Sequence, residues 1–312
     1  MRNLVTGGAG FLGSHLIDRL MRLKEEVICI DNFFTGSEEN IKYWGENPRF
    51  KIIKHDVINP IYFEVDKIWH LACSASPKIY SKNPIKTSKA NYLGTYNMLE
   101  LAKKTNAKIL LASTSEIYGE PEVHPQPETY YGSVNNIGIR SCYIEGKRIA
   151  ESLCFDYFRE FNTNIKIARI FNTYGPRMSV LDGRVISNFI VQTLKNNPIT
   201  IYGDGSQTRS FCYVDDLIEG LILLMNSNIQ GPINLGNPKE LKIIDLAKKI
   251  SLKINPNVKF IKNKLPQDDP KRRKPNIDLA ISKLKWKPKI SINDGLDKTI
   301  FYFKTTLKKN YY

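Results

Sequence analysis

The chain has 312 residues, of which 42% are hydrophobic and 25% are charged, and these ordinary proportions predict a globular protein with a substantial core. Its formal net charge of +15 at pH 7 favours anionic partners, either nucleic acid or a phosphorylated small molecule. The five cysteines include no CxxC pair and the four histidines lack metal-ligand spacing, so we expect neither a disulfide framework nor a metal site.

The expected location is the cytoplasm. Met1 leads almost directly into the apolar stretch NLVTGGAG, without a signal peptide. The longest apolar run, LIEGLILLM, is short for a bilayer span and is interrupted by a charge. Cysteines without a disulfide pattern are typical of a reducing compartment. We therefore expect no membrane partner.

Short apolar segments alternate with helical segments through the first half of the chain. Strands are expected at residues 3–7, 26–31, 50–57, 67–72, 108–114 and 165–171, and helices at 14–23, 88–105 and 143–161. Strands separated by helices indicate βαβ units. The predicted fold class is α/β, a Rossmann-like doubly wound parallel sheet with helices on both faces.

The pattern changes after about residue 175. Proline and glycine punctuate YGPRMSVLDGR, GDGSQTRSF and NLGNPKE, and helices are expected at 185–196, 215–226 and 243–254. A basic run, KLPQDDPKRRKP, spans 264–275, and the basic end FKTTLKKNYY is expected to be a helix that frays into a tail. A smaller C-terminal α/β region is therefore predicted.

The stretch TGGAGFLG places Gly7, Gly10 and Gly13 between a strand and a helix. Such a loop lets backbone N–H groups approach a pyrophosphate at the helix N-terminus. Asp31 ends the second strand 18 residues beyond Gly13, where an acid bonds the adenosine ribose hydroxyls and repels a 2′-phosphate. We weigh a simple tight turn against a cofactor site, and we predict NAD rather than NADP.

Tyr143 and Lys147 are four residues apart, so they share one face of a helix. Such a pair is usually a solvated surface pair. Here, LASTSEIYG places Thr114 at the C-terminal end of a strand, where open α/β sheets bind ligands. A phenol with a pKa near 10 becomes a base only when positive charge stabilises it, as a nearby ammonium and an oxidised nicotinamide would. We predict that Tyr143 removes an alcohol proton, that Lys147 holds the nicotinamide ribose, and that Thr114 bonds the reacting oxygen.

Across almost its whole length the chain resembles the UDP-glucuronic acid decarboxylases, or UDP-xylose synthases, of the extended short-chain dehydrogenase/reductase family. The matching stretches include VTGGAGFLGSHL, DNFFTG, NPIKTSKAN, CYIEGKRIAE, ARIFNTYGPRM, DGRVISNFI and YGDGSQTRSFCYVDDL. The most specific are TSEIYG with EVHPQPE, and QDDPKRRKP. Prolines usual in the family are missing from ACSASP and VNNIGIRSCY, which would loosen loops beside the sugar pocket.

The resemblance implies roles for individual residues. The implied catalytic residues are Thr114, Glu116, Tyr143, Lys147 and Arg273, with the neighbouring Arg272 as an alternative register for the last. The implied cofactor residues, besides Tyr143 and Lys147, are Gly7, Gly10, Phe11, Leu12, Gly13, Asp31, Asn32, Phe34, Thr35, Gly36, Asp56, Val57 and Leu71. The implied substrate residues are Tyr62, Lys89, Asn172, Arg184, Asn188, Arg209 and Arg273.

The resemblance also implies a reaction. UDP-glucuronate is oxidised at C4, the resulting β-keto acid loses carbon dioxide, and the retained NADH reduces C4 to give UDP-xylose. Residues 1–175 would bind NAD, and residues 176–312 would mainly bind the nucleotide sugar, with some segments returning to the first region. The apolar faces of the helices around 88–104 and 143–160 would pair two copies into a homodimer.

Two kinds of alternative remain. A nucleotide-sugar 4-epimerase or 4,6-dehydratase would share the first oxidation, although a dehydratase usually has an acid where this chain has Ser115. A non-catalytic NAD-binding or RNA-binding protein would account for the basic charge. We do not expect nucleic acid as a partner, because the basic run belongs to the resemblance and no RNA motif accompanies it.

Overall fold

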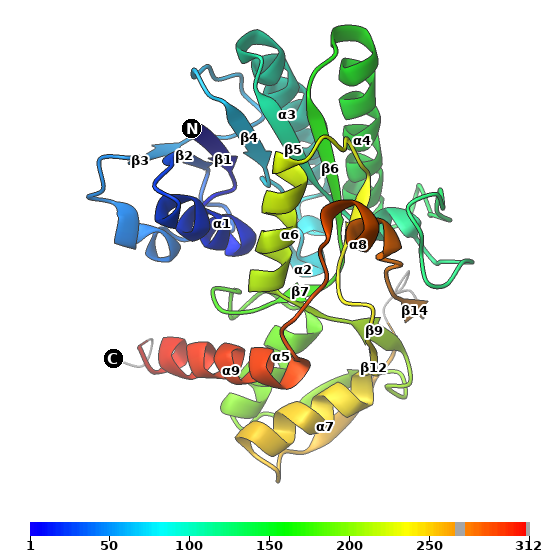
Figure 1. Ribbon diagram of the computed structural model, residues 1–312. Coiled ribbons are helices and arrows are strands. Elements are labelled where there is room, and N and C mark those ends of the chain that lie inside the picture. The colour runs from blue at the N-terminus through cyan, green and yellow to red at the C-terminus, as the bar shows by residue number, and fades with distance from the viewer. Residues whose placement is uncertain (266–271, 310–312) are drawn as a thin grey trace.

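A seven-stranded parallel sheet forms the centre of the protein, seen in a computed structural model that describes residues 1–265 and 272–309 (Figure 1). The strand order is β11-β6-β5-β4-β1-β2-β3. Their bounds are β1 Arg2–Thr6, β2 Glu26–Asp31, β3 Phe50–Lys54, β4 Lys67–His70, β5 Lys108–Thr114, β6 Ile165–Ile170 and β11 Ile233–Leu235. The predicted fold class is confirmed.

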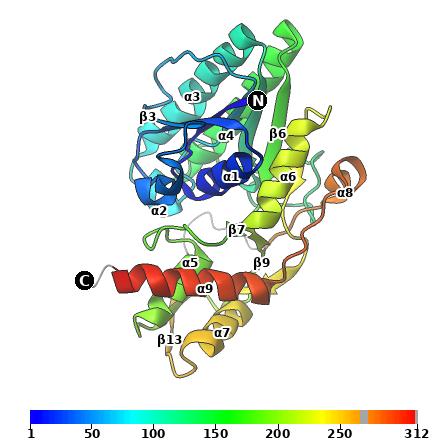
Figure 2. The ribbon, with the colours of Figure 1, turned by 60° about the vertical axis from the view of Figure 1, so that its left-hand side comes forward.

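Helices cover both faces of this sheet (Figures 1 and 2). One face carries α3 (Pro84–Thr105) and α4 (Ser141–Phe161), and the other carries α1 (Phe11–Arg22) and α6 (Val214–Asn226). Side chains alternate along a strand, so Leu4 belongs to the core beneath α3 and α4, while Val5 belongs to the core beneath α1 and α6. Burial on both faces explains why these strands read as nearly continuous apolar runs.

A smaller region lies at the carboxyl ends of the sheet strands and contains α5 (Val185–Leu194), α7 (Ile243–Ile254) and α9 (Ile292–Lys309) (Figure 2). Its strands form three small sheets: β7 Thr173–Tyr174 with β10 Cys212–Tyr213, β8 Ile199–Tyr202 with β13 Phe260–Asn263, and β9 Thr208–Ser210 with β12 Glu240–Lys242 and β14 Arg272–Arg273. The short helices α2 (Pro77–Tyr80) and α8 (Asp278–Leu284), and the 3-10 turns 38–40, 42–44 and 115–118, complete the described elements.

Several elements differ from those expected. The helix predicted at 88–105 begins four residues earlier, since Pro84 occupies the first turn, where its missing N–H costs nothing. No strand was predicted at NLGNPKE, yet β11 completes the edge of the large sheet from within the second half of the chain. The predicted C-terminal helix is α9, which extends to Lys309, and the tail predicted beyond it lies outside the described residues.

Among the described residues, no helix is both long enough and apolar enough to cross a membrane.

Candidate active site

A cavity of about 1040 Å³ lies between the carboxyl ends of the sheet strands and the smaller region. All of the predicted catalytic and cofactor residues line it, although they come from segments that are far apart in the sequence. The parallel topology accounts for this convergence, because the carboxyl ends of β1, β2, β4, β5 and β6 meet at one edge of the sheet.

The glycine loop forms one end of the cavity. Gly7 has a φ of +68°, a conformation that residues with a side chain rarely adopt, and a Cβ at Gly13 would lie 2.2 Å from the Gly7 carbonyl oxygen. The N-cap residue of α1, Gly10, makes no side-chain capping bond. No capping side chain occupies the backbone N–H groups of the first turn, and Phe11, Leu12 and Gly13 line the cavity, which fits a dinucleotide pyrophosphate.

Asp31 stands at the end of β2, and its carboxylate is held from two sides. Ala9 N–H donates to Oδ2 at 3.0 Å, and Phe33 N–H donates to Oδ1 at 2.8 Å. Burial raises the pKa of Asp31, and these backbone hydrogen bonds oppose that rise. Each oxygen keeps an acceptor site for a ribose hydroxyl, so the residues present fit the adenosine end of NAD.

Tyr143 and Lys147 lie side by side on the buried face of α4, four residues apart as expected. The Lys147 ammonium donates to the Ala112 carbonyl at 2.9 Å, and burial lowers the pKa of Lys147. Burial also raises the pKa of the Tyr143 phenol, and a hydrogen bond with the Thr114 side chain opposes this only in part. The phenol therefore needs additional positive charge in the cavity to act as a base at neutral pH.

Glu116 lies in the turn after β5, between two arginines. Its carboxylate forms ion pairs with Arg140 and Arg273. Burial alone would raise the pKa of Glu116, but the charges of Arg273, Arg140 and Arg209 outweigh burial and lower it. Glu116 is therefore a carboxylate at neutral pH and can hold a water molecule or a polar group of a ligand.

Sequence reasoning missed two residues of this cluster. Tyr80 stacks on Tyr143 with ring centroids 5.0 Å apart and an interplanar angle of 3°. Arg140 Nε donates to the Tyr80 hydroxyl at 2.9 Å, and burial raises the pKa of Tyr80 to about 12. Arg140 stands three residues before Tyr143, one helical turn away, and this spacing could have revealed it.

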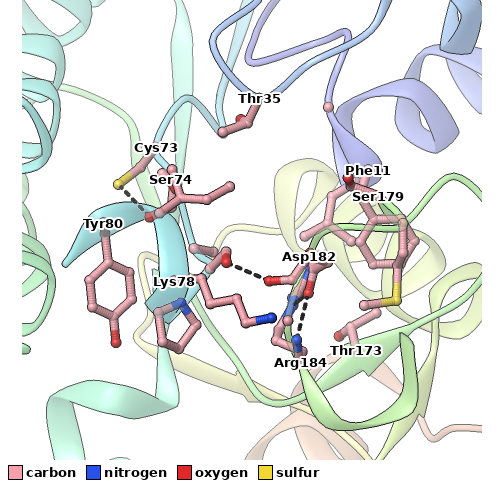
Figure 3. A pocket seen from close by; sticks show the side chains of 18 of the residues that line it. Phe11, Thr35, Cys73, Ser74, Lys78, Tyr80, Thr173, Ser179, Asp182 and Arg184 are labelled. Carbon is pink, nitrogen blue, oxygen red and sulfur yellow. Dashed lines mark hydrogen bonds and ion pairs between the residues drawn. The ribbon is translucent and has the colours of Figure 1, made fainter. Parts of the chain in front are cut away.

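The smaller region supplies the opposite wall of the cavity, and Figure 3 shows part of it. Arg184 forms an ion pair with Asp182, Nε to Oδ1 at 2.6 Å, and lies over the Phe11 ring of the glycine loop at 5.8 Å. Lys78 extends toward this pair from α2. Five of the predicted substrate residues line the cavity, namely Asn172, Arg184, Asn188, Arg209 and Arg273.

Two predicted substrate residues lie elsewhere. Tyr62 is 55% exposed and its hydroxyl donates to Glu64, outside the cavity. Lys89 is exposed on α3, whereas Lys86 and Thr87 line the cavity. NPIKTSKAN contains both lysines, and the helix turns Lys86 rather than Lys89 toward the site. Of the two arginines considered near the end of the chain, Arg273 is buried against Glu116, and Arg272 is exposed.

Residues 3–236 match the NAD dependent epimerase/dehydratase family. The chain is 56% identical over 297 residues to UDP-glucuronic acid decarboxylase 3 of Arabidopsis thaliana, covering 95% of this chain and 87% of that protein. It is 53% identical over 307 residues to UDP-glucuronic acid decarboxylase 1 of Xenopus tropicalis, covering 98% and 73% of the two chains. The structure of UDP-glucuronic acid 4-epimerase from Bacillus cereus, in complex with UDP-glucuronic acid and NAD, is similar with a TM-score of 0.89 and 30% identity, covering 98% of this chain and 100% of that one.

Proposed function

This chain belongs to the NAD dependent epimerase/dehydratase family, and on that premise we propose that it is a UDP-glucuronate decarboxylase, which converts UDP-glucuronate to UDP-xylose and carbon dioxide. The observation that carries the proposal is the Glu116 carboxylate, paired with Arg273 and Arg140 in the same cavity as Tyr143. The family resemblance implied Glu116 and Arg273 for this chemistry, and the structure joins them in one ion pair.

The glycine loop and Asp31 would hold NAD, which would supply the two-electron hydride acceptor for the sugar C4 and the hydride for its later reduction. The chain's own residues handle protons and charge. Tyr143 accepts the proton of the C4 hydroxyl, and Thr114 donates a hydrogen bond to the same oxygen. Lys147 keeps a positive charge beside the phenol and binds ribose hydroxyls. The other predicted cofactor residues line the same cavity.

The C4 ketone makes loss of carbon dioxide easy, because the electrons left at C5 delocalise into the carbonyl as an enolate. Thr114 and Tyr143 are placed to stabilise that oxyanion by hydrogen bonds, a contribution that is large in a site closed to water. Glu116 and Arg273 hold the water that protonates C5, and the hydroxide left behind regains a proton from the solvent. Tyr143 then returns its proton to the C4 oxygen.

The substrate would lie across the two regions of the chain. We assign residues 1–175 to NAD binding and residues 176–312 mainly to nucleotide-sugar binding. Arg184 and Arg209 provide charge for the UDP pyrophosphate, and Asn172 and Asn188 provide amide donors. The buried Arg209 already donates to the Thr208 carbonyl at 2.8 Å, so its guanidinium is held in place.

A 4-epimerase is the second candidate, because solved 4-epimerases share this fold. An epimerase has to retain the substrate carboxylate. The deciding experiment is incubation of the purified protein with UDP-glucuronate and no added reductant, followed by mass spectrometry of the nucleotide sugar. A product lighter by one carbon dioxide supports the proposal, and a product of unchanged mass supports the epimerase.

Asp31 is expected to select NAD over NADP. Its carboxylate would lie against the 2′-phosphate of NADP, and two like charges in a partly buried site repel by several kcal/mol. We expect NAD to bind at least about tenfold more tightly than NADP, since each 1.4 kcal/mol is a factor of ten. Asp31→Ala should narrow this difference in affinity, because it weakens the binding of NAD and removes the repulsion of the NADP 2′-phosphate. Calorimetric titration of cofactor-free protein measures both affinities, and equal affinities in the wild type would remove Asp31 from cofactor selection.

The protein is expected to be a homodimer that pairs α3 and α4 across a two-fold axis. These helices expose Tyr92, Tyr96, Ile149 and Phe161, each by more than 40%, which supports a contact surface there. Light scattering at micromolar concentration should give twice the mass of the chain. A monomeric mass throughout that range would contradict the proposal.

The proposed location is the cytoplasm. All five cysteines are free thiols, as is usual in reducing compartments. Fractionation of the source cells, with detection of the protein in the soluble cytoplasmic fraction, tests this assignment.

A further inference from the structure

Two of the most specific sequence motifs meet in the structure. The motif EVHPQPE, residues 122–128, lies beside the segment 272–276, which carries Arg273. Gln126 N–H donates to the Lys274 carbonyl at 2.9 Å, and Asn276 N–H donates to the Gln126 carbonyl at 2.9 Å. These bonds form an isolated parallel bridge between Gln126 and Pro275. The chemistry proposed above gives EVHPQPE no role.

The Gln126 side chain adds to this bridge. It is fully buried, its Oε1 accepts from Lys274 N–H at 2.9 Å, and its Nε2 donates to the Val123 carbonyl at 2.8 Å. The main chain at Lys274 is therefore held at both its N–H and its carbonyl by one glutamine. A buried amide with both ends bonded fixes its partners more firmly than a solvated one.

The residue next to this clamp is Arg273. Its guanidinium pairs with Glu116 and donates to the Gly119 carbonyl at 2.8 Å. On its other side, β14 pairs with β9, where Arg273 is in register with Arg209. A two-residue strand is a weak support for a long side chain, because it makes few ladder bonds of its own.

His124 of the same motif fastens the surrounding strands. Its Nε2 lies 3.0 Å from Oε2 of Glu240 in β12, and Thr208 of β9 donates to Oε1 of Glu240 at 2.6 Å. EVHPQPE therefore contacts both the segment that follows Arg273 and the small sheet, β12-β9-β14, to which Arg273 belongs.

We propose that Gln126 is a positioning residue for the decarboxylation step, acting by holding the Lys274 main chain so that Arg273 meets Glu116. The inference rests on the proposed function. Displacement of a catalytic group by about 1 Å can cost a hundredfold in rate. Loss of the side-chain half of the clamp, the bond from Lys274 N–H to Gln126 Oε1, should therefore lower kcat while leaving binding of the UDP moiety intact.

The test variant is Gln126→Met, which has similar volume, no hydrogen-bond donor and only a weakly accepting sulfur. We expect kcat for carbon dioxide release to fall by roughly 10- to 100-fold. The Kd of UDP, measured by calorimetry, should stay near the wild-type value. Asn3→Leu is the matched control, since Asn3 is also fully buried and its amide bonds the Met1 and Glu26 carbonyls at the opposite end of the sheet. It should lower the melting temperature and leave kcat near wild type.

A double-mutant cycle separates positioning from general structural damage. In an Arg273→Lys background, Gln126→Met should cause little further loss of kcat, since the arginine it positions is gone. Equal losses in the two backgrounds, or an unchanged kcat in the single variant, would overturn the inference. If Gln126→Met does not fold, Gln126→Glu keeps the acceptor for Lys274 N–H, and a smaller loss of kcat with the same dependence on Arg273 is expected.

A wild-type protein that releases no carbon dioxide would instead refute the proposed function, and this inference with it.

Discussion

Tyr143→Phe should fold, bind NAD and lose nearly all turnover, with kcat about 10²- to 10⁴-fold lower. The ring is buried and stacked on Tyr80, so phenylalanine keeps the packing and removes only the hydroxyl. That hydroxyl is the proton acceptor for the sugar alcohol in the proposed reaction. Steady-state kinetics with UDP-glucuronate, together with the melting temperature and the cofactor content of the purified variant, measures these outcomes.

The matched control is Tyr157→Phe, which removes a partly buried hydroxyl from the same helix. Tyr157 donates to Glu100 at 2.6 Å and lies outside the cavity. Tyr157→Phe should be less stable than the wild type and retain kcat near the wild-type value.

In the wild type, kcat should rise with pH as the Tyr143 phenol ionises, because burial raises the pKa of this phenol. Near wild-type turnover by Tyr143→Phe would remove this residue from the mechanism.

The largest expected effect on stability comes from Arg169→Met. Arg169 in β6 pairs with Glu151 of α4 at 2.8 Å, with the two side chains 11% and 10% exposed. Glu151 also accepts from Ser113 at 2.5 Å, and Arg169 donates to the Tyr118 hydroxyl at 3.0 Å. Removal of the guanidinium leaves an uncompensated buried charge, which costs about 3–5 kcal/mol. Urea unfolding should show this loss in the free energy of unfolding.

Arg159→Met tests whether burial of the ion pair is the reason for the loss of stability expected in Arg169→Met. Arg159 pairs with Asp156 on the same helix, but the side chains are 65% and 57% exposed. Exposed ion pairs contribute about 0–1 kcal/mol to stability, so Arg159→Met should lower the free energy of unfolding by no more than that. Adding Glu151→Gln to Arg169→Met should recover part of the lost stability, because the buried charge is then removed. A loss below about 1 kcal/mol in Arg169→Met would show that Glu151 finds another partner or water.

Local spacing was sufficient to predict much of the site. The strand before Gly7, the helix after Gly13 and the acid at Asp31 form one short unit, so their order along the chain already indicates a cofactor loop. Tyr143 and Lys147 are four residues apart, so their spacing alone predicts that they share one face of a helix. Thr114 was found because it ends a strand, and strand ends converge in a parallel sheet.

Contacts between distant segments could not be read in this way. Tyr80 reaches Tyr143, and Gln126 reaches Lys274, only through the tertiary fold, and no periodicity connects these positions. Lys89 was predicted as a substrate residue and Lys86 was not, because a motif with two lysines does not say which of them a helix places at the cavity. β11 was missed because three residues are too few to show a strand pattern.

The most direct test of the proposed function is turnover of UDP-glucuronate in deuterium oxide, with NMR and mass spectrometry of the product. Decarboxylation through a C4 ketone, with protonation of C5 by water, predicts UDP-xylose that carries one solvent deuterium at C5 and none at C4. A product that keeps its carboxylate, or UDP-xylose without deuterium at C5, would contradict this account.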